Sequence, residues 1–447
     1  MPVYPPIVSV PEEEIVQING WNNGNAGPFV NGSKVYCLMR TIGPGTSGPP
    51  QDEVSLSGQE SQITMMKSED VGATWVRLDG PTNEVGLYSF GEGHFNTSAY
   101  VKDGIFYVCY TNNLAGPYTQ FAAPLRLVGF DTFAETWTAE SSDGPWVRQA
   151  QNNSRRTVSH FPIPIAGNKV IVLFTANDDS PPDNDHGTSF RGSAYYTIYD
   201  IDADTWTSKT LVRAGTFDGT TVGISVFPVA GEYDGTDTHV ICVQWDTATD
   251  EQRFYHHKVA VDGTVSGGTL VFTQSSALGS SVPLEAGRLL IMDGYLALSF
   301  VISNTSGVMN AGLVISDSLT PTTWTVQDSG QATYLLNGES CMSTNAFKHG
   351  TDIRLYYKDT TYPGYIGALS RMVWNGTTWS GPTMVMDRDD DWTGLDANDV
   401  NMSEIGDTDV AVAMASDWPF YYGVVGPVIE PPPTTTGKPM NIMTYHV

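Results

Sequence analysis

One strand-like motif recurs seven times along this chain and constrains its fold more than any other feature. Each copy has a turn that contains Gly, Asn or Asp, followed by a run of apolar residues, as in GSKVYCLMRT and DGIFYVCYTN. The runs begin 56 to 70 residues apart. Their first apolar residues are Val35, Ile105, Val170, Val240, Leu296, Ile353 and Val410. This near-constant spacing predicts repeated structural units, each of which buries its apolar surface against its neighbours.

A second mark, the pair Thr-Trp, lies between successive runs. The pairs begin at Thr74, Thr136, Thr205, Thr323 and Thr378. Each Trp is predicted to begin the last strand of a four-stranded unit and to fill the groove between neighbouring sheets. A β-sandwich also has short strands and frequent turns, but it has no reason to repeat one signature seven times. The sequence therefore predicts an all-β fold, a seven-bladed β-propeller of four-stranded antiparallel sheets.

The two ends of the chain predict how this ring closes. Only three strands fit between the run at Val410 and the proline-rich PPPTTTGKP, while Glu14 to Ile18 has the pattern of one strand before the first repeat. That N-terminal strand is expected to pair beside Tyr421 to Val425, because closure removes an exposed sheet edge. The predicted domains are an N-terminal arm (1–12), the propeller (13–430) and a Pro-rich C-terminal arm (431–447).

The charge of the chain limits its partners. Asp and Glu number 49 against 22 Lys and Arg, a formal net charge of -27. Such a field repels phosphate backbones, so nucleic acid is not an expected partner. No apolar window is long enough to span a bilayer, and the N-terminus has no basic segment followed by an apolar one. We expect no membrane insertion and no signal peptide, and synthesis in the cytoplasm.

The segment SEDVGATW resembles a known repeat. Ser68, Asp70, Gly72, Thr74 and Trp75 match the Asp-box of sialidase-like (BNR-repeat) propellers, and looser copies accompany four other Thr-Trp pairs. The resemblance implies a propeller fold, since Asp-boxes are structural hairpins. The early Arg-x-Pro of catalytic sialidases has no counterpart here. A weaker likeness, to seven-bladed polysaccharide lyases, rests on the His-x-Asn at His94 and Asn96 ahead of the Asp103-Gly104 turn.

Candidate site residues lie where the innermost strands begin. Those strands are expected at 24–30, 94–100, 159–165, 223–228, 281–286, 340–347 and 400–404, and their starts meet at one mouth of a propeller. The candidate ligand-binding residues there are Asn23, His94, Asn96, His160, Glu285, Glu339, Asp399 and Asn401. A lyase needs a base and a cation that neutralises a carboxylate, for which the candidates are His94 or His160 with Arg155 or Arg156. The alternative is that these polar residues line a hydrated channel.

The sequence predicts neither a cofactor nor a disulfide. The acid-rich loops 181–187 and 387–392 bring oxygen ligands together, which leaves structural calcium open, but neither has the spacing of an EF-hand loop. Three of the four cysteines, Cys37, Cys109 and Cys242, lie in apolar strands, and Cys341 has no zinc-type spacing with another Cys. All four are expected to be reduced and unpaired.

Two functions fit these features. The first is a non-enzymatic structural or adhesion propeller, such as a phage virion component, that docks on other protein subunits through its terminal arms and binds surface glycans. Exposed aromatic residues would serve the glycan, because sugar rings stack on them. The alternative is a carbohydrate-active enzyme acting at the propeller funnel, a polysaccharide lyase before a glycosidase.

Overall fold

The structure is a computed structural model of the chain, and it describes twenty segments of it. They are residues 8–9, 25–31, 34–42, 60–69, 76–78, 87–90, 101–111, 122–148, 161–176, 192–217, 223–246, 249, 251–274, 287–303, 309–332, 344–359, 368–386, 399–405, 409–415 and 421–425. Within these segments the fold is entirely β, without a helix. All strand pairs are antiparallel, as the turn-rich sequence predicts.

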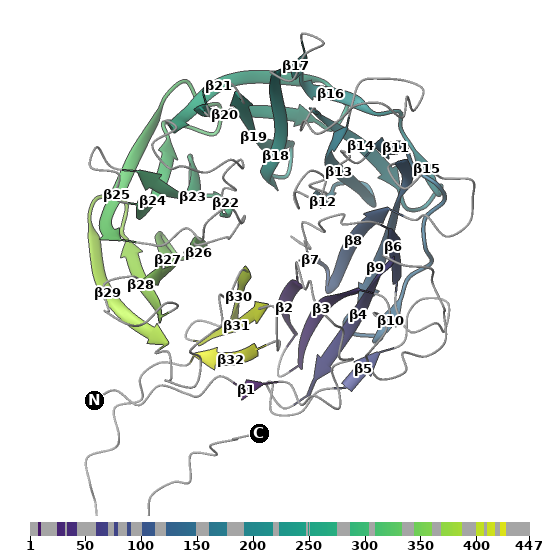
Figure 1. Cartoon of the computed structure of the whole chain (residues 1–447), viewed down its shortest axis with the longest axis horizontal. Helices are drawn as coiled ribbons and strands as arrows, with labels where there is room; N and C mark the ends of the chain where they lie inside the picture. Colours follow the sequence, from purple (N-terminus) through teal and green to yellow (C-terminus); the bar gives the residue numbers. More distant parts are fainter. Residues whose placement is uncertain are drawn as a thin grey trace, which may run out of the picture.

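The described strands form seven sheets of four or five strands, arranged in a ring (Figure 1). We number the sheets in chain order. Their innermost strands are β2 (Asn25–Asn31), β7 (Val101–Lys102), β12 (Phe161–Ile165), β18 (Gly223–Tyr233), β22 (Leu289–Ile291), β26 (Thr344–His349) and β30 (Asp399–Ile405). The second strands are β3 (Lys34–Ile42), β8 (Ile105–Thr111), β13 (Lys169–Ala176), β19 (Asp237–Asp246), β23 (Leu296–Ser303), β27 (Asp352–Asp359) and β31 (Asp409–Ala415). Each second strand contains one of the seven apolar runs.

The outer half of each sheet is less regular. The third strands are β4 (Glu60–Ser68), β9 (Ala122–Asp131), β14 (Ser193–Asp200), β20 (Glu251–Ala260), β24 (Met309–Ser316), β28 (Ala368–Trp374) and β32 (Tyr421–Val425). The fourth strand is one piece in three sheets: β21 (Val265–Gln274), β25 (Trp324–Ala332) and β29 (Trp379–Met386). It is two pieces in the first three sheets: β5 (Val76–Leu78) and β6 (Leu87–Phe90), β10 (Thr136–Trp137) and β11 (Trp146–Arg148), β15 (Thr205–Trp206) and β16 (Thr210–Arg213). A short strand β17 (Thr216–Phe217) adds to β18.

The seventh sheet combines the two ends of the chain. Strand β1 (Val8–Ser9) pairs with β32 through Val8 opposite Tyr422 and Ser9 opposite Tyr421. The partner predicted from the sequence, Glu14 to Ile18, lies outside the described residues. Strand β1 falls within residues 1–12, which the sequence predicts to be an arm. Strand β2 of the first sheet also lies against β30 and β31.

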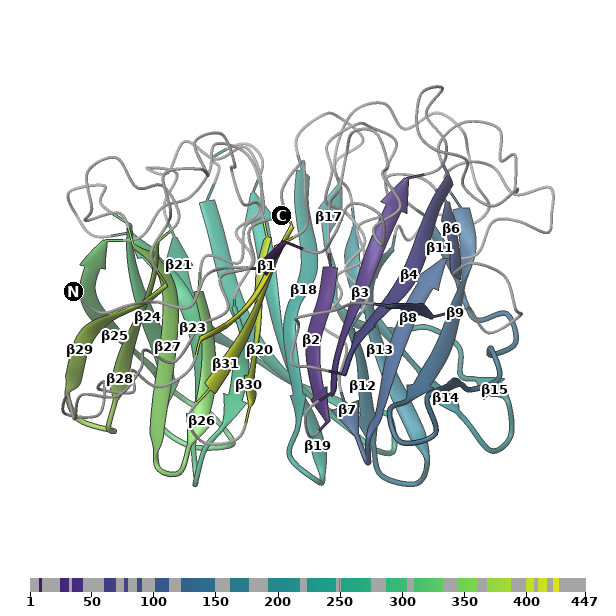
Figure 2. The ribbon, with the colours of Figure 1, turned by 90° about the horizontal axis from the view of Figure 1, so that it is seen from below.

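The hydrophobic cores lie between neighbouring sheets. Between the fourth and fifth sheets, Ile241, Val243 and Phe254 pack with Leu298 and Phe300. Similar clusters join the second sheet to the third, the third to the fourth and the fifth to the sixth. The third, fourth and fifth sheets are therefore apolar on both faces, which explains why their second strands are continuous apolar runs. The strands run along the ring axis in the side view (Figure 2).

The Thr-Trp marks begin outer strands, as predicted. Thr136-Trp137, Thr205-Trp206, Trp324 and Trp379 stand at the starts of β10, β15, β25 and β29. The acid or amide that precedes each pair closes the turn. Asp131 accepts hydrogen bonds from the backbone N–H groups of Phe133 and Ala134, for example, and Asn375 accepts them from Thr377 and Thr378. Such Asx turns account for the residue pattern of the marks.

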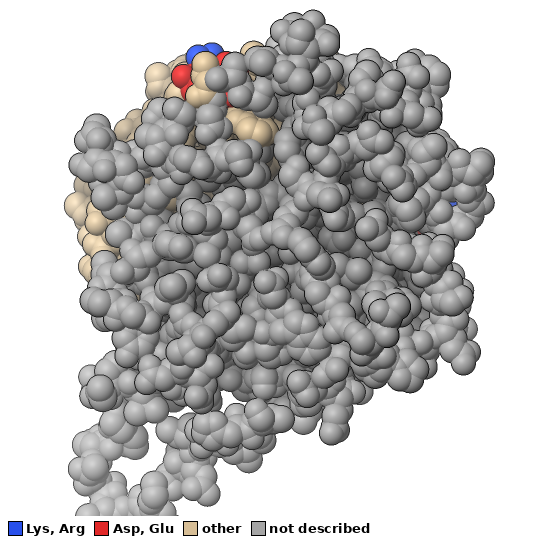
Figure 3. All heavy atoms as spheres, viewed as in Figure 1, with Lys and Arg blue, Asp and Glu red and all other residues tan. Residues whose placement is uncertain are grey.

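The exposed outer edges carry little charge. On the face seen in Figure 3, most of the visible atoms of described residues belong to uncharged residues. Strands β21 and β25 each expose an apolar residue, Leu270 and Val326, beside Ser and Thr. Both edges are interrupted by bulges, at Phe254/Tyr255 and His256/His257 against β21 and at Asn310/Gly312 against β25. These bulges make the edges poor templates for pairing with other chains, although Lys and Arg are scarce there.

Candidate functional site

The structure describes few of the site residues that the sequence predicts. Asn23, His94, Asn96, Arg155, Arg156, His160, Glu285 and Glu339 lie outside the described residues. Asp399 and Asn401 lie on the innermost strand β30, where they pair with Ala415 and Ala413. The predicted innermost strands agree closely with β2, β12, β18, β26 and β30, whereas β7 and β22 begin later than expected.

The inner wall of the ring carries two ionisable side chains, close enough to interact electrostatically, that the sequence did not point to. Glu232 lies on β18 of the fourth sheet, and Arg288 immediately precedes β22 of the fifth. Burial raises the pKa of the Glu232 carboxyl, while the charge of Arg288 and the backbone N–H of Tyr233 act in the opposite direction. The Arg288 guanidinium lies 5.3 Å from the ring centroid of Phe347 on β26. The Arg288 side chain, from the fifth sheet, therefore lies between Glu232 of the fourth sheet and Phe347 of the sixth.

Close packing fixes the backbone beside Arg288. The Arg288 N–H donates to the Ser299 hydroxyl at 2.7 Å, and its carbonyl accepts from the Ser299 N–H at 3.0 Å. The preceding residue must be glycine, since a Cβ atom at Gly287 would lie 2.2 Å from Ser299 Oγ and 2.5 Å from the Thr344 carbonyl oxygen. Innermost strands of two sheets thus meet at Gly287, directly before the exposed Arg288.

A buried chain of polar side chains crosses the fourth sheet. Asp234 Oδ2 lies 3.0 Å from His239 Nε2, and His239 Nδ1 lies 3.0 Å from His256 Nε2. His239 and His256 are 0% and 2% exposed. Burial raises the pKa of Asp234, but the N–H groups of Asp237 and Thr236 and the His239 ring outweigh it and lower that pKa overall. An ionised Asp234 accepts from His239 Nε2–H, so that His239 Nδ1 accepts from His256 Nε2–H.

The imidazole rings of His239 and His256 are both neutral near neutral pH. Burial lowers the pKa of His239, and burial with the nearby His239 and His257 lowers the pKa of His256 to about 3. The His256 ring lies 5.8 Å from the ring of Trp324 in the fifth sheet. His239 and His256 are both buried, and no nucleophilic side chain lies beside them among the described residues. We therefore interpret the hydrogen bonds from Asp234 to His256 as a structural network.

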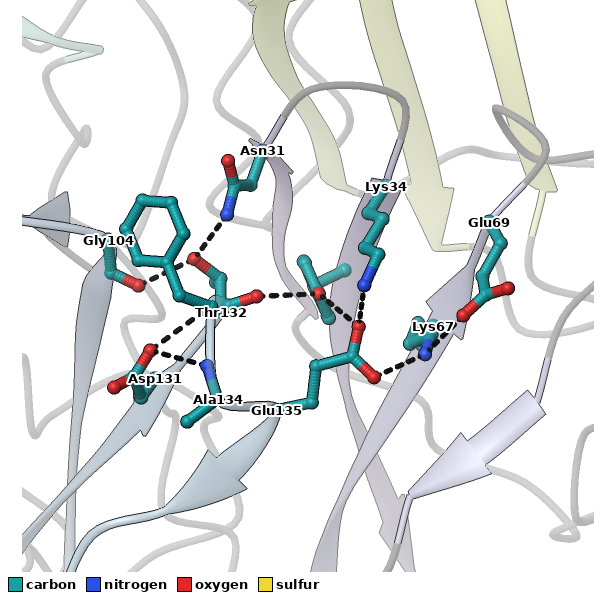
Figure 4. A network of polar contacts seen from close by, with 11 residues as sticks. Asn31, Lys34, Lys67, Glu69, Gly104, Asp131, Thr132, Ala134 and Glu135 are labelled. Atoms are coloured by element: carbon teal, nitrogen blue, oxygen red, sulfur yellow. Dashed lines mark hydrogen bonds and ion pairs between the residues drawn. The ribbon is translucent and has the colours of Figure 1, made fainter.

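A third polar cluster joins the first two sheets (Figure 4). Glu135, in the turn between β9 and β10, reaches across to the first sheet, where it forms ion pairs with Lys34 and Lys67. Lys67 also pairs with Glu69 at 2.7 Å. Hydrogen bonds from Lys34 and then Lys67 lower the pKa of Glu135 to about 2. Burial and the Glu135 carboxylate raise the pKa of Tyr36 to about 12.

The same kind of turn forms the next junction. Asp204, two residues before Trp206, accepts from the backbone N–H of Ser142 in the second sheet at 2.8 Å. Trp206 Nε1 donates to the Ser142 carbonyl at 2.9 Å. Glu135 and Asp204 occupy the same place before Thr-Trp and share a positive φ, 55° and 49°. These turns hold neighbouring sheets together and are structural.

Cysteine and metal expectations are tested only in part. Cys109 and Cys242 are free and buried, as predicted, and burial raises the pKa of both thiols. Cys341 and the side chain of Cys37 lie outside what the structure describes. The described residues contain no cluster of three or more His, Cys, Asp or Glu side chains suited to a metal ion. They also contain no helix with the length and hydropathy to cross a bilayer.

Comparisons with known proteins identify a fold. No protein-family model matches the sequence, and no curated protein matches it. Among solved structures, a polysaccharide lyase, an ulvan lyase, matches 92% of this chain and 96% of its own at a TM-score of 0.50 and 12% identity. Trypanosoma rangeli sialidase matches 79% of this chain but only 56% of its own, at a TM-score of 0.43 and 11% identity. Penicillium chrysogenum α-L-arabinanase matches 83% and 98%, at a TM-score of 0.44 and 14% identity. The chain thus shares its propeller-like fold with the ulvan lyase, and its likeness to a polysaccharide lyase is confirmed as one of structure.

Proposed function

We propose that this chain is a glycan-binding β-propeller of seven blades, with its ligand at the mouth where the innermost strands begin. The seven antiparallel sheets would be the blades, and β1 would close the ring by completing the seventh. The observation that carries the functional proposal is the end-to-end likeness to a polysaccharide lyase, which spans nearly all of both chains. Binding sites of ring-shaped folds gather side chains from several units. The sequence predicts His94, Asn96, His160 and Asn401 near this mouth.

The first form of this function is recognition without catalysis. The chain would be an adhesion subunit of a large assembly such as a phage virion, holding other subunits through the residues that precede β1 and through residues 431–447. The proline-rich composition of the second arm supports docking, since extended proline segments lose little entropy on binding. The formal charge of -27 supports solubility rather than nucleic-acid contact.

The second form is a polysaccharide lyase, which the same structural likeness favours. A lyase removes the proton beside a uronate carboxylate and expels the sugar oxygen at the neighbouring carbon. His94 or His160 would be the base that takes the proton, and Arg155 or Arg156 would neutralise the carboxylate. No cofactor enters this scheme, and calcium would be structural.

One experiment separates the two forms. Alginate, ulvan and glycosaminoglycans are incubated with the full chain, and the ultraviolet absorbance of new unsaturated ends is followed, while binding to each polymer is measured by affinity electrophoresis. Absorbance that disappears in both His94→Ala and His160→Ala establishes the lyase. Retardation without absorbance supports recognition alone. A chain that neither binds nor cleaves any polysaccharide, acidic or neutral, refutes the glycan proposal.

A further inference from the structure

Arg288 differs from most of the described cations in what surrounds it. Arg213 also lacks an ion pair among the described residues, but it donates hydrogen bonds to Gln244 and is less exposed. Lys67 pairs with Glu69 and Glu135, Arg126 with Asp143, and Lys258 with Asp237. Arg288 makes no ion pair within the described part of the chain, and its side chain contacts the Phe347 ring instead. In a chain of formal charge -27, an exposed guanidinium without a carboxylate partner is unusual.

The position of Arg288 is on the inner wall of the ring. Its backbone extends the β22–β23 ladder through Ser299. Its side chain lies near Phe347 of β26 in the next sheet and acts electrostatically on Glu232 of β18 in the preceding one. Innermost strands of three successive sheets converge only on the side that faces the ring centre, where Figure 1 shows β18, β22 and β26.

Glu232 does not neutralise Arg288. The two side chains form neither a hydrogen bond nor an ion pair among the described contacts, and burial outweighs the Arg288 charge in setting the Glu232 pKa, which is raised. A tight pair would have lowered it. The Phe347 ring, itself 5% exposed, supports one face of the guanidinium and leaves its N–H donors available.

We propose that Arg288 binds a carboxylate group of a glycan that extends from the mouth along the inner wall, towards the hairpins that follow β18, β22 and β26, so that the ligand is an acidic polysaccharide of the uronate class. This inference rests on the proposed glycan-binding function. A guanidinium presents paired N–H donors that match the two oxygens of a carboxylate, whereas a neutral sugar offers it no counter-charge. Gly287 and Ser299 hold its backbone in place before a ligand arrives, which lowers the entropy lost on binding.

The test compares Arg288 with a matched exposed arginine. Arg253, at the start of β20, is exposed and ion-paired with Glu251. Full-length wild type, Arg288→Ala, Arg288→Lys and Arg253→Ala are titrated against polygalacturonate, carboxyl-reduced polygalacturonate and dextran sulfate. We expect Arg288→Ala to weaken polygalacturonate binding by at least about tenfold, Arg288→Lys to recover part of it, and Arg253→Ala to match wild type.

Each outcome bears either on the role of Arg288 or on the proposed glycan binding. Wild-type binding that is equal for polygalacturonate and its carboxyl-reduced form refutes the inference and leaves glycan binding standing, as does Arg288→Ala with wild-type affinity. Tighter binding to dextran sulfate with no Arg288 dependence refutes the carboxylate assignment. Binding to no polysaccharide at all refutes the proposed function itself. Arg288→Lys keeps the test valid if Arg288→Ala melts at a lower temperature than wild type.

Discussion

His239 Nδ1 and His256 Nε2 lie 3.0 Å apart, a direct imidazole–imidazole hydrogen bond inside the fourth sheet. Only one proton can occupy that bond, and Asp234 decides where it sits by accepting from the far nitrogen of His239. Protonating either ring would place a charge in a site that water does not reach. The neighbouring His257, whose Nε2 is buried without a partner, faces the same difficulty.

Acidification is therefore expected to destabilise the chain through its histidines. Burial, together with the Arg213 charge, lowers the pKa of His257 to about 4, below its usual value near 6.5. As the pH falls, the unfolded chain binds a proton at His257 before the folded chain does. The free energy of unfolding is therefore unaffected by His257 above about pH 6.5 and decreases as the pH falls towards about 4. His257→Phe removes the titrating group without breaking a hydrogen bond of Nε2. Chemical-denaturation midpoints measured between about pH 6.5 and 4 should therefore fall less steeply for this variant than for wild type. An unchanged pH profile would contradict the assignment.

The Glu135 junction should respond to pH in a lower window. Glu135→Gln leaves Lys34 and Lys67 without their shared carboxylate, and it should destabilise the chain by about 1–3 kcal/mol near neutral pH. Because the pKa of Glu135 is lowered to about 2, its contribution is present above about pH 4.5 and is lost as the pH falls towards 2. The variant and wild type should therefore converge in acid. Glu69→Gln, which removes a more exposed partner of Lys67, is the control and should have a smaller effect at neutral pH.

Strand β1 gives a prediction for truncated chains. Removing residues 1–10 deletes Val8 and Ser9 and exposes the edge of β32, whereas removing residues 1–6 leaves the pair intact. The longer deletion should lower the melting temperature by several degrees and the shorter one should not. Equal melting temperatures for the two deletions would show that β1 contributes nothing to stability.

The buried thiols of the chain are expected to react slowly with thiol reagents. In a Cys37→Ser, Cys341→Ser background, only Cys109 and Cys242 remain, and both are buried with raised pKa values. A thiol reagent should label neither in the native state and both after denaturation, since the thiolate is the reactive species. Fast native labelling would place at least one of them at an accessible position.

The fold was predictable because its signals are local. A Gly or Asp turn followed by an apolar run specifies a second strand: at Asp103-Gly104 both residues have the positive φ that a tight hairpin turn requires, 54° and 78°. Thr-Trp was informative for the same reason. The sequence does not decide between Val8-Ser9 and Glu14 to Ile18 as the partner of β32, because both are short alternating segments. Only the pairing with Tyr421 and Tyr422 identifies Val8-Ser9 as one strand that pairs there.

The charged groups of the inner wall could not be predicted in this way. Glu232 and Arg288 are 56 residues apart in the sequence, and nothing local relates them. Arg288 looks like any arginine at the start of an apolar run. Its distinction is an exposed side chain that forms no ion pair among the described residues, although the Glu232 carboxyl is close enough to feel its charge. The His239–His256 bond likewise depends on the antiparallel register of β19 and β20, which brings Ile241 opposite His256.

The pairing of β1 with β32 also sets how the molecule would yield to mechanical force. The register runs Val8 to Tyr422 and Ser9 to Tyr421, so the segment before β1 and the segment after β32 leave the pair at the same end. Tension applied through those two segments would load the hydrogen bonds one after another, like a zipper, rather than all at once in shear. A force applied through the residues before Val8 and after Val425 would therefore act along the direction in which this strand pair resists least. The seventh sheet would then be the first to open under load.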